Sequence, residues 1–236
     1  MMPSVVILAG GTATRLRPIT ETIAKSMVEV AGKPFIAHQM ALLKSNGISD
    51  VVICSGHLSH QIESFVGDGS DFGLSVRYSN DGEKLLGTGG AVKKALNLLG
   101  EEFFVMYGDS YLTVDFKEVY KIFTTSQKTG VMTVLKNADA WDKSNIVYHQ
   151  GKIIAYDKKN KLTGMNFIDY GLSMLKKEAF VSMNTREAFD LSEVLQNLIS
   201  QNQMAGFEVK ERFYEIGSLN GLTETEKYIL MTKTGG

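Results

Sequence analysis

The chain has 236 residues, of which 44% are apolar and 22% charged, so it can bury a substantial core and we do not expect disorder. Its 25 basic and 26 acidic side chains give a formal charge of −1, which excludes a nucleic-acid surface that depends on charge alone. No apolar run approaches the ~20 residues of a membrane span, and the single cysteine, Cys54, excludes an internal disulfide. We expect a cytoplasmic protein with no membrane or nucleic-acid partner.

Short apolar strands and helical patterns alternate along the first half of the chain. Strands are predicted at 4–9, 50–55, 74–79 and 103–109, and helices between them at 34–47, 60–67 and 91–100. Repeated strand-helix-strand units of this length predict right-handed crossovers. We therefore expect a mainly parallel sheet with helices on both faces.

Hairpins mix with helices after Asp115. This half predicts two strands joined by a turn at Gln150 and Gly151, together with helices at 116–127, 191–201 and from about 223, and strands at 130–137, 167–175 and 206–211. We expect it to extend the same sheet or to form a small lobe facing the carboxyl ends of the strands, where ligands of open α/β sheets bind. No linker or internal repeat divides residues 1–236, so we predict a single domain.

The loop after the first strand has an unusual composition, Leu-Ala-Gly-Gly-Thr-Ala-Thr-Arg-Leu-Arg-Pro. Gly10 and Gly11 lack a Cβ, so the backbone there can approach a ligand closely. Groups suited to phosphate oxygens follow at Thr12, Thr14, Arg15 and Arg17. The stretch predicts a polyphosphate site, although an ordinary strand-to-loop turn with solvated arginines is the alternative. Lys25, bracketed by small and apolar residues, favours the phosphate site.

The residues from Leu8 to Pro34 resemble the signature of the sugar-1-phosphate nucleotidyltransferases, which runs Gly-Gly-x-Gly-Thr-Arg-Leu-x-Pro, then Pro-Lys, then Gly-Lys-Pro. Later segments, Leu-Leu-Gly-Thr-Gly-Gly, Tyr-Gly-Asp-Ser-Tyr and Phe-Tyr-Glu-Ile-Gly-Ser, support the resemblance. Ala13 and Ala24 depart from it, standing where the family has glycine and proline. The resemblance implies a Rossmann-like α/β fold of the nucleotide-diphospho-sugar transferase type, with a nucleotide-binding half at about 1–115, an acceptor-binding half at about 116–236 and a small sugar-binding lobe.

The resemblance also implies an enzyme that joins a nucleoside triphosphate to a sugar 1-phosphate, releasing pyrophosphate with the help of Mg²⁺. Arg15, Lys25 and Asp109 would be catalytic, and Asp109 and Glu215 would hold the metal. Asp109 as a cap and Glu215 as a bystander are the alternatives, because Glu215 is one methylene longer than the family's aspartate. The residues expected to bind the nucleotide are Leu8, Ala9, Gly10, Gly11, Thr12, Thr14, Gly87, Thr88 and Gly108.

The acceptor is expected to contact residues that match the family's sugar pocket: Asp157, Lys158, Asp169, Tyr170 and Gly171. Plain surface charge is the alternative for the first two. The Leu-Gly-Thr-Gly-Gly segment most resembles that of heptose-1-phosphate guanylyltransferases, with muramic acid 1-phosphate uridylyltransferases next, so GTP with a heptose or mannose-type 1-phosphate is our best prediction. UTP or CTP with another sugar or phosphorylated alcohol is the alternative.

A second class of function stays open, because a fold does not fix an activity. A nucleotide-binding regulator without catalysis would explain Ala13, Ala24 and Glu215, whereas Arg15 and Lys25 favour an enzyme. His57 and His60 lie one helical turn apart, but without further ligands they predict no metal site. The sequence does not determine the oligomeric state, and a homo-oligomer is possible.

Overall fold

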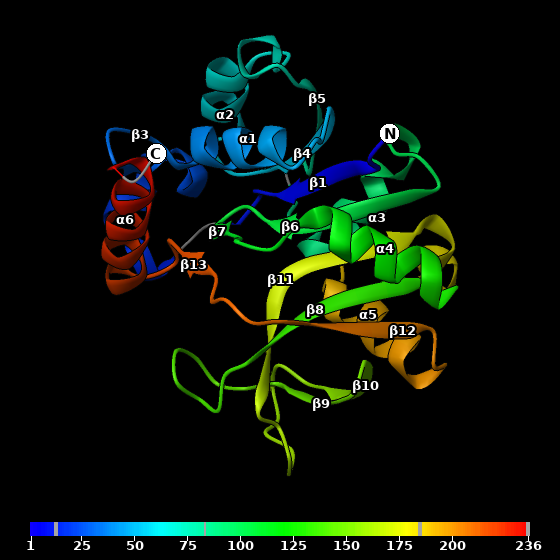
Figure 1. Cartoon of the computed structure of the whole chain (residues 1–236). Coiled ribbons are helices and arrows are strands. Elements are labelled where there is room, and N and C mark those ends of the chain that lie inside the picture. Colours follow the sequence, from blue (N-terminus) through cyan, green and yellow to red (C-terminus); the bar gives the residue numbers. More distant parts are fainter. Residues whose placement is uncertain (12–13, 83, 184–185, 235–236) are drawn as a thin grey trace.

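A nine-stranded sheet forms the centre of the molecule, in a computed structural model that describes residues 1–11, 14–82, 84–183 and 186–234 (Figure 1). The strand order is β5-β4-β1-β6-β11-β8-β12-β10-β9. Two short ribbons lie outside it, β2 (Glu29–Val30) with β3 (Lys33–Pro34), and β7 (Ser110–Tyr111) with β13 (Tyr214–Glu215). The mixed α/β architecture that the sequence predicts is confirmed.

The first half supplies four parallel strands, as expected from its alternating pattern. These are β1 (Ser4–Leu8), β4 (Asp50–Ser55), β5 (Ser75–Asn80) and β6 (Glu102–Tyr107). The helices between them are α1 (Phe35–Ser45), α2 (Ser59–Val66) and α3 (Gly87–Ala95). The last of these begins at Gly87, so the Gly-Thr-Gly-Gly segment forms its first turn.

The second half extends the same sheet, and this is where parallel pairing ends. β11 (Phe167–Lys176) runs antiparallel to both β6 and β8 (Gly130–Lys136), while β8 and β12 (Met204–Val209) are parallel. The sheet is therefore parallel over the first four strands and mixed beyond them, because β11 enters between two strands that run the other way. The helices here are α4 (Phe116–Ser126), α5 (Leu191–Ser200) and α6 (Leu219–Thr234).

The predicted hairpin is present as β9 (Ile146–His149) and β10 (Lys152–Tyr156). Its turn residues, Gln150 and Gly151, have φ values of +43° and +81°. Two positive φ angles match the right-handed twist of a two-residue hairpin. The hairpin closes the far edge of the sheet and extends below it in Figure 1.

Side chains of the central strands alternate between two cores. Val5 and Ile7 of β1 join a cluster with α1, α2 and α4, while Val6 joins one with α3 and α5. This alternation places helices on both faces of the sheet. Cys54 is buried in the second cluster, as a small hydrophobe, and burial together with the charge of Asp81 raises its pKa to about 12.

The chain reverses its direction of growth at β1, since β4 and β5 lie on one side of it and β6 on the other. Ligands of open α/β sheets bind at such a switch point, beyond the carboxyl ends of the strands. Here Gly108 N–H donates to Leu8 O at 2.9 Å, which holds the two strand ends together. The β7–β13 ribbon adds the residues around Glu215, and Ile216 N–H donates to Asp109 O at 3.0 Å.

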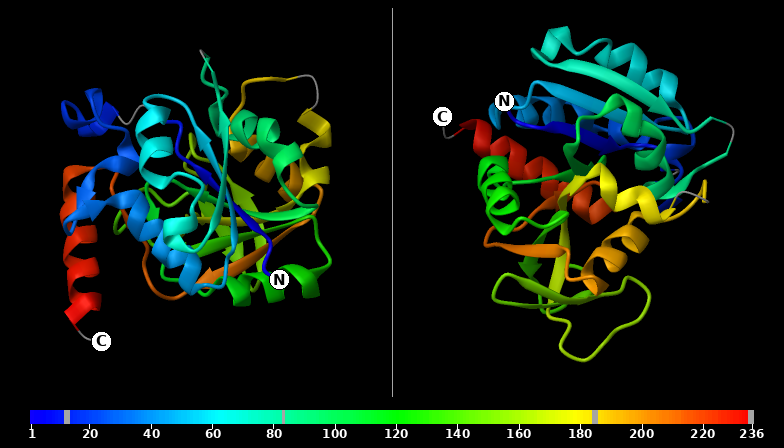
Figure 2. Two further views of the ribbon diagram at one scale, coloured as in Figure 1. Left: turned by 90° about the horizontal axis from the view of Figure 1, so that it is seen from above. Right: turned by 90° about the vertical axis from the view of Figure 1, so that its right-hand side faces the viewer.

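The C-terminal helix α6 stands at one edge of the molecule, as the turned views of Figure 2 show. Val30, Phe35, Ile216 and Ile229 form a small core between it, the β2–β3 ribbon and the start of α1. That packing fixes the first turn of α6 beside the switch point. No helix in the described residues combines the length and the apolar character that a membrane crossing needs.

Candidate active site

Two cavities adjoin at the carboxyl ends of β1 and β6. The small cavity has a volume of about 250 Å³ and lies over these strand ends; the large cavity, of about 900 Å³, is lined from β11, β13 and α6 and from the loops beside them. Tyr107 and Asp109 line both cavities. Molecules bound in the two cavities would therefore meet at Asp109.

Residues predicted for the nucleotide and for catalysis gather around the small cavity. Thr14 is exposed and lines neither cavity, and Thr12 and Ala13 lie outside the described residues. The predicted residues that line the small cavity are Leu8, Ala9, Gly10, Gly11, Lys25, Gly87, Thr88, Gly108 and Asp109.

The glycines of this site have two different physical roles. A Cβ built on Gly11 would meet nothing within 4 Å among the residues that the structure describes, so its backbone is open to a ligand. A Cβ built on Gly108 would lie 2.7 Å from Leu8 O, so this glycine is required for the close approach of β1 and β6. From the sequence, both glycines were expected to contact the nucleotide. The structure shows open space only at Gly11, because β1 occupies the space beside Gly108.

The Gly-Thr-Gly-Gly turn is held by the start of α5. The N–H groups of Gly89 and Gly90 donate to Phe189 O at 2.9 and 3.2 Å, so they are not directed at a ligand. Thr88 Oγ1 accepts from Leu191 N–H at 2.8 Å and thus caps α5, not its own helix. Of this segment, the first two residues, Gly87 and Thr88, line the small cavity, so their predicted contact with the nucleotide stays a prediction.

Lys25 and Asp109, which lie 84 residues apart in the sequence, meet at the junction of the cavities. Lys25 Nζ lies 2.5 Å from Asp109 Oδ2, and their side chains are 17% and 29% exposed. The other carboxylate oxygen of Asp109 accepts from Ser110 Oγ at 3.2 Å. The carboxylate is thus bound to side chains and does not cap a following helix. Ala24 donates its N–H to Gln61 Oε1 at 2.8 Å, a bond that the family's proline could not make.

Arg15 lies close to the same point. It lines the large cavity, and a Cβ built on Gly217 would lie 3.1 Å from Arg15 Nη2 and 3.0 Å from Lys25 Nζ. The two cations predicted to be catalytic therefore both border Gly217, next to Asp109. Arg17 is exposed and lines neither cavity.

Glu215 reaches this region because two glycines leave space for its longer side chain. A Cβ on Gly217 would lie 2.5 Å from Glu215 Oε2, and one on Gly221 would lie 2.7 Å from Glu215 Cδ. Its carboxylate accepts hydrogen bonds from Gly217 N–H and from Ser218 Oγ, the latter at 2.8 Å. The carboxylate is therefore oriented by the first turn of α6 and lines the large cavity.

Lys158 is held at the boundary of the two cavities. Its Nζ donates to Tyr107 OH at 3.2 Å and lies 3.5 Å from Asp190 Oδ1. Burial alone would lower the pKa of Lys158, but the phenol of Tyr107 and the charges of Asp169 and Asp190 outweigh it, and the pKa is raised. This ammonium group stays charged, as an anion-binding role requires.

The other residues predicted for the acceptor line the large cavity in different ways. Asp169 is fixed by Tyr156 OH and by Gly171 N–H, each at 3.0 Å. Tyr170 is 0% exposed and its hydroxyl accepts from Thr113 N–H, so it supports the wall from behind and offers no surface to a ligand. The register in which β11 pairs with β8 shifts between Asp169 and Ser173, so the regular pairing of the two strands is interrupted beside the cavity.

Asp157 also lines the large cavity, but its carboxylate caps its own turn. It accepts from the N–H groups of Lys159 and Asn160 at 2.7 and 3.0 Å. Hydrogen bonds from Asn160 and Lys159 hold the pKa of Asp157 below its usual range. These contacts account for an aspartate at this position without any ligand.

Two residues that the sequence reasoning missed also line the small cavity. Ser26 is 2% exposed and its Oγ has no hydrogen-bond partner among the described residues. Asp81 follows β5, and its Oδ2 accepts from Leu86 N–H at 3.2 Å. Burial raises the pKa of Asp81. The signals in the sequence were only a polar residue after Lys25 and an acid after a strand.

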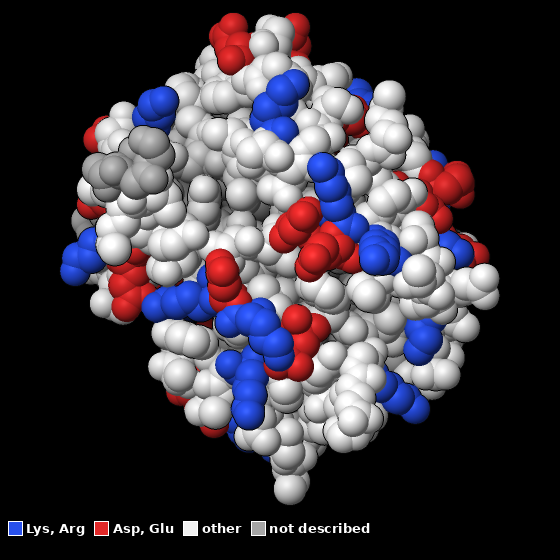
Figure 3. All heavy atoms as spheres, viewed as in Figure 1, with Lys and Arg blue, Asp and Glu red and all other residues white. Residues whose placement is uncertain are grey.

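The lining of the large cavity carries both basic and acidic side chains, so its charges do not form a field of one sign. Basic and acidic side chains lie interspersed on the face seen in Figure 3. Among the described residues, no group of three or more His, Cys, Asp or Glu side chains is arranged to hold a metal ion.

Known proteins share both the sequence and the fold. A family model described as nucleotidyl transferase matches residues 4–231. The chain is 28% identical to the N-acetylmuramate alpha-1-phosphate uridylyltransferase of Neisseria meningitidis, over 94% of this chain and 96% of that protein. It is 27% identical to a D-glycero-alpha-D-manno-heptose 1-phosphate guanylyltransferase of Campylobacter jejuni, over 90% of this chain and 93% of that protein.

The solved structure of HddC from Yersinia pseudotuberculosis, complexed with GMP-PN, has a TM-score of 0.79 to this chain at 24% identity, covering 97% of this chain and 100% of that one. This likeness confirms the predicted fold. The matches to the family model and to the two curated relatives confirm the predicted resemblance. The chain belongs to the nucleotidyl transferase family.

Proposed function

We propose that this chain transfers a nucleotidyl group from a nucleoside triphosphate to a sugar 1-phosphate, releasing pyrophosphate and forming a nucleotide-sugar. The observation that carries the proposal is the pair of cavities that share Asp109, with Lys25 bound to it. The small cavity would take the nucleotide and the large cavity the sugar phosphate. The activities in the names of the curated relatives support this assignment.

The residues at the junction suit an in-line displacement that needs no covalent intermediate. An oxygen of the sugar phosphate attacks the α-phosphorus, and the bond from that phosphorus to the pyrophosphate oxygen breaks. Arg15 and Lys25 would neutralise the phosphate oxygens that crowd together as the two anions meet. Lys158, which stays charged, would hold the phosphate of the acceptor.

Asp109 and Glu215 fit a Mg²⁺ ion. They offer carboxylate oxygens, and the β7–β13 ribbon pairs Glu215 with Ser110, the neighbour of Asp109. Mg²⁺ is commonly held by one or two carboxylates together with substrate phosphates and water, so no third protein ligand is required. Bound there, the ion would supply positive charge to the phosphates.

Asp81 favours a guanine base in the small cavity. A carboxylate accepts hydrogen bonds but cannot donate them. Guanine presents two adjacent donors, N1–H and the N2 amino group, whereas the N3–H of uracil or thymine is flanked by two carbonyl oxygens that a carboxylate repels. A partly buried Asp81 beside the base would therefore select GTP, which agrees with the sequence-based preference for GTP with a heptose or mannose-type 1-phosphate.

The test is a pyrophosphate-release assay with Mg²⁺, each common nucleoside triphosphate and a panel of sugar 1-phosphates. We expect GTP to be productive with a neutral sugar 1-phosphate. The variant Asp81→Asn should lose selectivity for GTP over UTP by roughly tenfold, the value of one good polar contact to a base. No release with any pair would instead support a nucleotide-binding regulator, and preference for UTP in the unchanged protein would overturn the role of Asp81.

Glu215→Gln should weaken activation by Mg²⁺ without unfolding the protein. The amide keeps the length of the side chain and an oxygen that can accept from Ser218 Oγ, but it removes the negative charge that would hold the ion. We expect the Mg²⁺ concentration for half-maximal rate to rise severalfold, with thermal unfolding close to that of the unchanged protein. Unchanged Mg²⁺ dependence would make Glu215 a bystander.

Ser26→Ala should raise the KM for the nucleoside triphosphate about tenfold, the value of a hydrogen bond to a charged group. Ser55→Ala is a matched control, because Ser55 is also buried and has an Oγ without a partner among the described residues, but it lines neither cavity. Neither substitution removes a hydrogen bond within the described structure, so both variants should fold. Equal KM values for the two variants would remove Ser26 from the nucleotide site.

A further inference from the structure

The only tryptophan of the chain, Trp141, lies in the loop between β8 and β9 and lines the large cavity. Its side chain is 50% exposed, although tryptophan is a residue that folding usually covers. None of the roles assigned above uses it. The question is what this ring does at the wall of the acceptor cavity.

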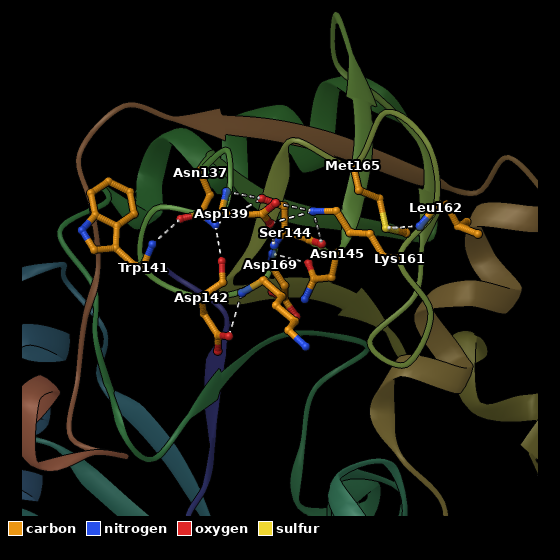
Figure 4. A network of polar contacts seen from close by, with 11 residues as sticks. Asn137, Asp139, Trp141, Asp142, Ser144, Asn145, Lys161, Leu162, Met165 and Asp169 are labelled. Carbon is orange, nitrogen blue, oxygen red and sulfur yellow. Dashed lines mark hydrogen bonds and ion pairs between the residues drawn. The ribbon is translucent and has the colours of Figure 1, made fainter.

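The loop that carries Trp141 is built to hold it in place. Asn137 and Ser144, at the two ends of the loop, are 3% and 2% exposed and are hydrogen-bonded to each other at 3.2 Å. Asp139 accepts from Ser144 N–H at 2.6 Å and pairs with Lys161 at 2.6 Å (Figure 4). These contacts fasten the loop to the segment between β10 and β11.

The backbone of this loop is also strained. Ala138 and Asp139 have φ values of +45° and +61°, a conformation that costs free energy for residues other than glycine. Such strain persists where the surrounding contacts impose it, and it is common where a side chain is positioned for a ligand. Figure 4 shows the Trp141 ring directed away from the polar network that holds the loop.

Arg212 joins Trp141 to the other wall of the cavity. Its guanidinium carbon lies 4.9 Å from the centre of the Trp141 ring and 4.8 Å from that of Tyr214, and its Nη2 donates to Glu224 at 2.8 Å. Arg212 precedes Glu215 by three residues, which span at most ~10 Å of chain. The large cavity, of about 900 Å³, has room for a sugar ring with its phosphate.

The charge of this wall is balanced. Arg212 is paired with Glu224, and Lys161 with Asp139. Basic and acidic side chains are equal in number on the described lining of the large cavity. An arginine–carboxylate pair offers donors and acceptors side by side, which suits neighbouring hydroxyl groups, whereas a carboxylate on the ligand would lose its hydration at a wall that carries no net charge to compensate it.

We propose that Trp141 stacks on the sugar ring of the acceptor and that the Arg212–Glu224 pair binds its hydroxyl groups, so that the enzyme selects an uncharged, polyhydroxylated sugar over an acidic one. The inference rests on the proposed function, because it assigns the large cavity to the sugar phosphate. It adds the chemical class of the sugar and the residues that read it.

The first test uses the intrinsic fluorescence of Trp141, which reports on this wall alone because the chain has one tryptophan. The probes are the neutral sugar 1-phosphate that releases most pyrophosphate in the panel, and inorganic phosphate as a control. We expect the sugar phosphate to shift the emission to shorter wavelength, since stacking removes water from the ring, and phosphate to leave it unchanged. A sugar phosphate that saturates turnover without changing the emission would overturn the proposal.

The second test measures kinetics. Trp141→Ala should raise the KM for the sugar phosphate roughly tenfold, the size of one aromatic contact, and leave the KM for the nucleotide unchanged. Trp141→Phe keeps a ring and should stay within about threefold of the unchanged protein. An unchanged acceptor KM in Trp141→Ala, despite normal turnover in the unchanged protein, refutes the stacking role. Absence of turnover in the unchanged protein refutes the proposed function instead.

A third test compares a neutral and an acidic substrate. Glucose 1-phosphate and glucuronic acid 1-phosphate are a matched pair, because they differ only in that the hydroxymethyl group of the first is a carboxylate in the second. We expect at least tenfold higher kcat/KM for the neutral sugar. Glu224→Gln, which leaves the charge of Arg212 unbalanced, should narrow that ratio. Equal or better use of the acidic sugar by the unchanged protein would overturn the selection.

Discussion

Replacing Asp109 by asparagine should lower kcat for pyrophosphate release by at least ~100-fold, the size of a lost electrostatic contact to the transition state. Asp109 lines both cavities, binds Lys25 at 2.5 Å and follows β6 at the switch point of the sheet. The amide keeps the shape of the side chain but removes the charge that would hold Mg²⁺. The loss should therefore appear in kcat and in the Mg²⁺ concentration needed for half-maximal rate.

The control for this substitution is Asp142→Asn. Asp142 lines the large cavity as well, but its carboxylate accepts from the neighbouring Lys143 N–H on an exposed loop. We expect a near-normal kcat for Asp142→Asn. The thermal unfolding of both Asp109→Asn and Asp142→Asn should be close to that of the unchanged protein. Near-full turnover by Asp109→Asn would remove Asp109 from the metal site and from the reaction centre.

The lining of the small cavity could be predicted because most of its residues follow parallel strands of one alternating strand-helix pattern. Parallel strands end at the same edge of a sheet, so the glycine loop after β1 and the Gly108–Asp109 step after β6 had to be neighbours. Lys25 follows the loop closely enough in sequence to reach back to it. Local pattern and topology together were sufficient for these residues.

Long-range contacts account for what could not be predicted. Gly90 donates its N–H to Phe189 O, about a hundred residues later, and nothing in the local sequence indicates that partner. Gly217 and Gly221 make space for Glu215, which becomes visible only when α6 is in place. Tyr170 is buried because it lies on the same face of β11 as Ile168 and Leu172, and its hydroxyl accepts a hydrogen bond from Thr113 N–H, 57 residues earlier.

Asp81 and Ser26 could not be identified from the sequence for a second reason. Asp81 and Ser26 are single polar residues without a recurrent spacing, so periodicity and motifs do not mark them. Their environment does, since one is a partly buried carboxylate and the other a buried hydroxyl without a partner among the described residues, and both line the small cavity. A polar group becomes informative once its burial is known.

Replacing Lys25 by methionine should reduce kcat/KM by roughly 100- to 1,000-fold, as removal of a charge that stabilises the transition state does. Methionine keeps the length and the apolar stem of the side chain, but it leaves the Asp109 carboxylate without its ammonium partner. Lys33→Met is the control, because Lys33 is exposed in the β2–β3 ribbon and lines neither cavity. It should retain full activity.

A double-variant cycle then asks whether Lys25 and Asp109 act as one unit. Their 2.5 Å contact indicates that they serve the same phosphate transfer. The double variant Lys25→Met with Asp109→Asn should then be only slightly less active than the less active of the two single variants. Losses that multiply would show that the two residues act independently, and the ion pair would then be a feature of the protein without ligands. Full activity of Lys25→Met would remove the ammonium group from the reaction and leave Arg15, which also borders Gly217, as the cation at the junction.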